Sequence, residues 1–116
     1  MYRQGDVLLE KITELPERTK TKEALLVRGE GRDHGHFILG AEIEILKAED
    51  NELTNGGGLV TQYIHVKEEA ALKHLNIDSR EWTQEHAPIL IPPGKYRVIK
   101  QREYNPYSKA IRAVKD

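Results

Sequence analysis

The residues with the clearest chemical potential are histidines. The chain contains five of them, and two, His34 and His36, flank Gly35. On a β-strand, residues i and i+2 point to the same face, roughly 6–7 Å apart along the chain. Two neutral imidazoles placed in this way can converge on one divalent metal ion, such as zinc or another first-row ion. The glycine between them allows a second backbone or a ligand to approach closely.

A metal site of this kind needs a third protein ligand. Catalytic zinc sites typically use three and keep one position open for water. His86 is the best candidate because it directly precedes the apolar segment 87–91, and His65 is the second choice. His74 falls in a segment with helical character, where we expect a surface or packing residue. The predicted metal ligands are His34, His36 and His86.

Carboxylates lie close to these histidines in the sequence. Glu30 and Asp33 precede His34, and Glu85 precedes His86. If the metal activates a water molecule, Glu30 or Glu85 could act as the catalytic base of a metal-dependent hydrolase. Two other interpretations stay open. The histidines could line a pocket that contacts a small-molecule ligand directly, or they could be purely structural.

The charge distribution supports a different class of function. Residues 95–116 contain seven Lys or Arg and two acidic residues, although the whole chain has a net charge of −1. A basic face of this kind could bind nucleic acid through its phosphates. The candidate phosphate contacts are Arg97, Lys100, Arg102 and Arg112. A third class is an oligomeric assembly or adaptor protein, because small β domains often cover exposed strand edges by forming homo-oligomers.

The segments that would position these groups are mainly β. Residues 41–47 alternate between apolar and acidic side chains, and residues 59–66 are rich in β-branched and aromatic side chains. Both patterns are typical of strands. Residues 67–75 are the one predicted helix, because alanine and leucine favour helices and Glu69 and Lys73 form a favourable i,i+4 pair.

Turn residues recur about every ten positions, which predicts seven or eight short strands and one short helix. The fold class is therefore mainly β, as a small β-barrel or sandwich. The length of 116 residues predicts a single domain over 1–116.

Composition narrows the setting of the protein. There is no cysteine, which excludes disulfides and thiolate zinc sites. No apolar run is long enough to span a membrane, and the N-terminus lacks the apolar segment of a secretory signal. We therefore expect a cytoplasmic protein that does not enter membranes.

Two resemblances accompany these patterns. His34-Gly35-His36 followed by Glu42 resembles the first motif of the cupins, in which H-x-H precedes a glutamate on a small β-barrel. The spacing to Glu42 is longer than in that motif, and His86 precedes Pro92-Pro93-Gly94 where cupins place the histidine after them.

The second resemblance extends over more of the chain. Its motifs are Gln4-Gly5-Asp6-Val7, Gly35-His36, Glu85-His86-Ala87-Pro88-Ile89 and the segment 94–104. In these motifs the chain is similar to a group of small bacterial and phage proteins that has no assigned activity. This resemblance implies a compact domain that is inherited as a unit, and it implies no chemistry.

Overall fold

The chain folds into β-strands throughout the part that the structure describes. The structure is a computed structural model that describes residues 1–29 and 33–101, and these two ranges contain ten strands and no helix. Accordingly, no helix in these ranges could cross a membrane. The strands are β1 (Tyr2–Gln4), β2 (Val7–Ile12), β3 (Lys20–Thr21), β4 (Leu25–Arg28), β5 (His34–Gly40), β6 (Ile43–Lys47), β7 (Leu59–Val66), β8 (Ala70–Asn76), β9 (Ile89–Ile91) and β10 (Gly94–Lys100).

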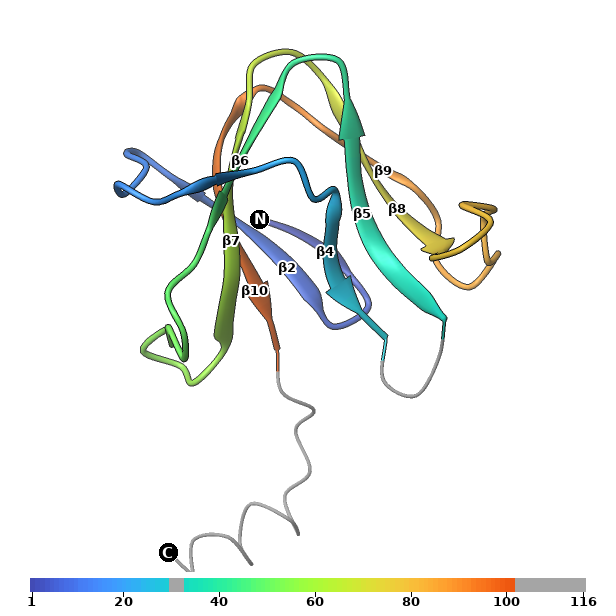
Figure 1. Ribbon diagram of the computed structural model, residues 1–116, viewed down its shortest axis with the longest axis horizontal. Coiled ribbons are helices and arrows are strands. Elements are labelled where there is room, and N and C mark those ends of the chain that lie inside the picture. Colours follow the sequence, from blue (N-terminus) through green and yellow to red (C-terminus); the bar gives the residue numbers. More distant parts are fainter. Residues whose placement is uncertain (30–32, 102–116) are drawn as a thin grey trace, which may run out of the picture.

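The ten strands form two antiparallel sheets that face each other (Figure 1). The six-stranded sheet has the order β1-β2-β10-β7-β6-β3, and the four-stranded sheet has the order β4-β5-β8-β9. Within the described ranges the sheets do not close into a barrel. The prediction of a mainly β fold is confirmed in its sandwich form, and the closed barrel that the cupin resemblance implies is not found.

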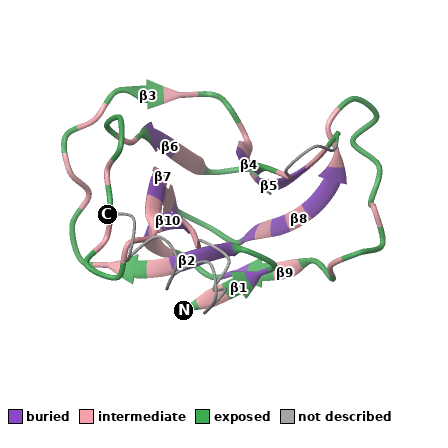
Figure 2. Cartoon of the chain, turned by 90° about the horizontal axis from the view of Figure 1, so that it is seen from below, coloured by how far each residue is buried: buried purple, intermediate pink, exposed green. Residues whose placement is uncertain are grey.

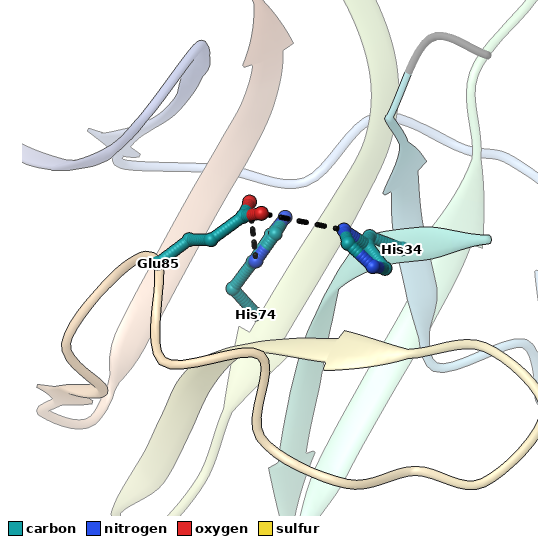
Figure 3. A group of neighbouring side chains, drawn as sticks. All are labelled: His34, His74 and Glu85. Atoms are coloured by element: carbon teal, nitrogen blue, oxygen red, sulfur yellow. Dashed lines mark ion pairs between the residues drawn. The ribbon is translucent and has the colours of Figure 1, made fainter. Parts of the chain in front are cut away.

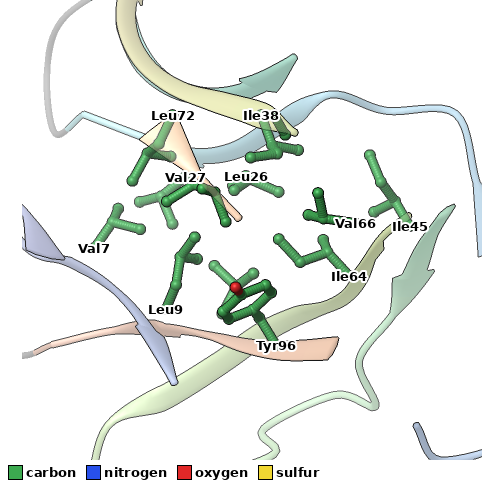
Figure 4. Packing of buried hydrophobic residues seen from close by; sticks show 13 residues of the cluster. Val7, Leu9, Leu26, Val27, Ile38, Ile45, Ile64, Val66, Leu72 and Tyr96 are labelled. Atoms are coloured by element: carbon green, nitrogen blue, oxygen red, sulfur yellow. The ribbon is translucent and has the colours of Figure 1, made fainter. Parts of the chain in front are cut away.

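The core lies between the two sheets (Figure 4). Alternate residues of each strand point inward, as the period of a strand requires. Val7, Leu9 and Tyr96 come from the six-stranded sheet and meet Ile38 and Leu72 from the four-stranded one. The hydroxyl group of the buried Tyr96 donates a hydrogen bond to the carbonyl of Pro92, at 2.7 Å, so its polar atom is satisfied. Exposed residues gather in the loops and turns (Figure 2).

The predicted helix over 67–75 is wrong, because residues 70–75 belong to strand β8 and residues 67–69 lie in the turn before it. Burial alternates along the first five residues of β8, with Leu72 and His74 buried and Ala71 and Lys73 half-buried. All seven residues of β8 pair with β5. The helix preference of alanine and leucine amounts to less than about 1 kcal/mol per residue, and pairing along a whole buried strand outweighs it.

The inner face of the four-stranded sheet changes character along its length. Ile38 pairs with Leu72, and two residues further along β5, His36 pairs with His74. Directly paired residues of antiparallel strands share a face. The apolar inner face therefore continues directly into a face of histidines.

Gly35 allows β4 to pack closely against β5. A Cβ atom at Gly35 would lie 2.3 Å from Cδ1 of Leu25 and 3.0 Å from the carbonyl oxygen of Val27. We expected a second backbone or a ligand to approach this glycine. In the structure, β4 approaches it.

We predict that Gly35→Ala lowers the free energy of unfolding by about 1–2 kcal/mol, because Leu25 and the β4 backbone must shift. Urea denaturation of the two proteins measures this difference. Gly56→Ala is the matched control, since a Cβ there would meet only Thr54 Oγ1, at 3.9 Å. Equal losses in both variants would contradict the close packing of β4.

Candidate metal centre

Four histidines gather where the apolar inner face of the four-stranded sheet ends. His34 and His36 lie on β5, His74 lies on β8, and His86 lies in the loop between β8 and β9. His74 occupies the middle of the group. Its ring centroid is 4.7 Å from that of His36, 4.9 Å from that of His86 and 5.6 Å from that of His34.

The closest set of ligand atoms belongs to His34, His74 and Glu85. One ligand atom from each of these residues lies within 4.8 Å of the other two, and no other such group occurs in the described ranges. The Glu85 carboxylate reaches both rings (Figure 3). Its Oε1 is 3.8 Å from Nδ1 of His34, and its Oε2 is 3.8 Å from Nδ1 of His74. These side chains could hold a metal ion.

Two details of this group fit a metal. Nδ1 of His34 is buried and has no hydrogen-bond partner in the structure, an arrangement that costs free energy unless something binds there. Nδ1 of His74 lies 2.5 Å from the hydroxyl of Thr83, which can donate onward to the His74 carbonyl at 3.3 Å. In that arrangement Thr83 accepts a hydrogen bond from Nδ1, so Nε2, and not the Nδ1 that faces Glu85, is the nitrogen of His74 with a lone pair for a metal. Orienting partners of this kind are typical of metal-binding histidines.

A buried amide fixes the other half of the histidine group. Nε2 of Gln4 donates hydrogen bonds to the carbonyls of Leu72 (3.0 Å) and Ala87 (2.8 Å). Its Oε1 is therefore the acceptor facing Nδ1 of His36, at 2.9 Å. This contact places a proton on Nδ1 of His36. Nε2 of the same ring faces Oδ1 of Asp6 at 3.5 Å.

Burial keeps the central imidazoles neutral. It lowers the pKa of His36 from 6.5 to about 4, with a further lowering from the nearby His74 and a partial opposing effect from Asp6. Burial also lowers the pKa of His74, and the neighbouring His86 lowers it further. Neutral imidazole is the form that binds metals, so no proton has to be displaced at neutral pH.

The structure places the predicted ligands in this group but with different partners. The rings of His34, His36 and His86 all neighbour the ring of His74, yet the closest set joins His34 to His74 and Glu85. His74, expected to be a surface or packing residue on a helix, is central to the group because its segment is a strand. The sequence signal for this strand is the alternation of side chains along Leu72, Lys73 and His74.

Other residues singled out in the sequence lie elsewhere. Glu85, predicted as a base, belongs to the group with His34 and His74 that could hold a metal, and Glu30 lies outside the described residues. His65 is on β7 in the other sheet, paired with Glu44 and Lys95.

The predicted nucleic-acid contacts are only partly described. The guanidinium of Arg97 forms an ion pair with Glu10 across the six-stranded sheet. Lys100 ends β10. Arg102 and Arg112 lie outside the described residues. Nucleic-acid binding therefore stays a prediction.

We predict that the metal-free protein loses stability as the pH falls from 6.5 to 4. In this window the unfolded chain binds a proton at His36 that the folded state excludes, which costs on the order of 3 kcal/mol. The neighbouring His74 and His86 also lower the pKa of His36, and Asp6 partly opposes this lowering. Urea denaturation with chelator, at pH 7 and pH 4.5, measures the effect. His36→Gln should show a smaller pH dependence. An unchanged dependence in His36→Gln would contradict the burial of a neutral ring.

We also predict that Gln4→Met lowers the free energy of unfolding by about 2–4 kcal/mol, because it removes three hydrogen bonds and leaves Nδ1 of His36 without its partner. Gln62→Met is the control. Gln62 makes one long hydrogen bond, 3.4 Å to the Leu25 carbonyl, and its Oε1 is buried without a partner. That change should cost less than about 1 kcal/mol. Similar losses in the two variants, again by urea denaturation, would refute the special role of Gln4.

Comparisons with known proteins identify a family and no activity. No curated protein gives a significant match to the chain, and neither does any solved structure. A family model described as a domain of unknown function, DUF8820, matches residues 3–101. This range includes the whole histidine group with Gln4, Asp6 and Glu85. In agreement with the resemblance to an uncharacterised group, the chain belongs to the DUF8820 family of domains of unknown function.

Proposed function

We propose that this domain binds a divalent metal ion, zinc or another first-row ion, through His34, His74 and Glu85. The observation that supports the proposal is the convergence of their ligand atoms within 4.8 Å on the inner face of a β-sandwich. Ligand atoms of a tetrahedral zinc site lie about 3.3–3.5 Å apart, since zinc bonds to nitrogen and oxygen measure about 2.0–2.2 Å. Small rotations of the three side chains would bring the ligand atoms from the spacing in the structure to the spacing of a zinc site.

The distribution of the ligands between strands and loop supports such a closure. His34 and His74 come from paired strands, which hold their backbones in place. Glu85 comes from the loop after β8, and its side chain is 41% exposed, so its carboxylate has room to move. The two nitrogens thus set the position of the ion and the carboxylate adapts to it.

The chemical nature of the ligand set indicates which ions fit. Two histidines and one glutamate form the protein ligands of several hydrolytic zinc enzymes, and two histidines with one carboxylate also bind iron(II) in oxygenases. Both types of site keep positions open for water or substrate. The hydrolase predicted from the sequence belongs to this proposal as its extension. Glu85 cannot be ligand and base at once, so another group would have to accept the proton.

The test is metal content and thermal stability of the full chain, purified without a histidine tag. Zinc at roughly 100-fold above its Kd should stabilise the folded state by about 2.7 kcal/mol relative to protein in chelator. His34→Ala and Glu85→Gln should remove the part of this stabilisation that comes from this site, because each removes a ligand. His65→Ala, a histidine change on the opposite sheet, should retain it. If the wild-type protein melts identically with chelator and with zinc, and elemental analysis finds no stoichiometric metal, the proposal fails.

A further inference from the structure

Asp6 and His36 face each other in an arrangement that the ligand set of His34, His74 and Glu85 does not use. Asp6 lies in the turn between β1 and β2, next to Gly5. Its Oδ1 is 3.5 Å from Nε2 of His36. The hairpin of one sheet thus brings a carboxylate to a histidine of the other sheet.

The hydrogen bonds of Gln4 determine what this contact can be. Oε1 of Gln4 accepts a hydrogen bond from Nδ1 of His36. A neutral His36 therefore carries its proton on Nδ1 and has a lone pair on Nε2. That lone pair faces the carboxylate oxygen of Asp6. Two acceptors at this distance repel each other unless a cation lies between them.

A proton is a poor candidate for that cation. An N–H donor and a carboxylate oxygen in a charge-assisted hydrogen bond are about 2.7–2.9 Å apart, and this contact is 3.5 Å. An imidazolium at His36 would also sit at 3% exposure beside the rings of His74 and His86. Burying a charge next to two further imidazoles is costly. A metal ion, which binds both the lone pair and the carboxylate, removes this repulsion.

His86 offers a third ligand beside the same space. A Cβ atom at Gly5 would lie 3.1 Å from Nε2 of His86 and 3.4 Å from Cε1 of His36, so both rings approach the Gly5 backbone closely and a side chain there would crowd them. Their centroids are 5.8 Å apart. Two imidazoles bound to one zinc ion have centroids about 5–6 Å apart. The positive φ of Gly5, 59°, adds a backbone reason for glycine at this position.

We infer that Asp6, His36 and His86 form a second divalent-metal site, beside the site proposed at His34, His74 and Glu85. This inference goes beyond the proposed function because it has its own ligands. The rings of His36 and His74, one from each site, have centroids 4.7 Å apart, so the two ions would be neighbours. The ligand atoms of this trio are more widely spaced than those of the first group, so the Asp6 side chain, which is 47% exposed, must rotate inward to complete the second site.

The first test counts ions. Metal-free full-length protein is titrated with Zn²⁺ by calorimetry, and the stoichiometry is checked by elemental analysis after desalting. The wild type should bind two equivalents. Asp6→Asn and His86→Gln should bind one, and His34→Ala should also bind one, at the Asp6 site. Asp50→Asn, an exposed aspartate in a turn next to the other sheet, should still bind two.

The outcomes separate the two sites. One equivalent that is lost in His34→Ala and kept in Asp6→Asn overturns the second site and leaves the proposed function standing. One equivalent that is lost in Asp6→Asn and His86→Gln but kept in His34→Ala supports the second site and overturns the first. Absence of binding in the wild type overturns both.

A second measurement is independent of folding defects in the variants. Nitrogen-15 chemical shifts of His36 in the metal-free wild type at pH 7 report which ring nitrogen carries the proton. A protonated Nδ1 with a lone pair on Nε2 is expected, and the Nε2 signal should shift when Zn²⁺ is added. An imidazolium at His36, or a signal that zinc leaves unchanged, would overturn the inference.

Discussion

The candidate site depends on the buried side-chain amide of Gln4. This amide connects β1 of one sheet to a carbonyl of β8 in the other sheet, to the loop before β9 and to the ring of His36. An unpaired amide in such a place would cost more than any single hydrogen bond contributes. All its partners must therefore be in position at once. This requirement fixes the β1–β2 hairpin over the histidines, although Gln4 itself binds no metal in either proposed site.

In both proposed sites, strands and connecting segments supply different kinds of ligand. Nitrogen ligands come mostly from β5 and β8, whose pairing continues directly from the apolar core. Oxygen ligands come from connecting segments, Asp6 in a hairpin turn and Glu85 in the loop after β8. The core thus keeps His36 and His74 neutral and in place, while the more exposed carboxylates can adjust to an ion. The same packing that stabilises the fold prepares the histidines for binding.

Local patterns predicted part of this arrangement. Residues 59–66 have the bounds of β7, and the H-x-H pair does lie on one strand, so short-range periodicity sufficed there. His74 was assigned to a helix because alanine, leucine and a Glu–Lys pair outweighed a two-residue alternation. This segment is a strand because it pairs with β5, and that pairing joins residues far apart in the sequence. Gln4 drew attention only as part of a motif, because a lone amide carries no signal of what it will bond to.

The loop after β8 carries a feature of practical value. Trp82 is the single tryptophan of the chain, and its side chain is half exposed. Its indole N–H donates a hydrogen bond to the carbonyl of His86, at 2.9 Å. Indole emission responds to changes in hydrogen bonding and solvation. The fluorescence of the unmodified protein therefore reports directly on the loop that carries Glu85 and His86, without an attached dye.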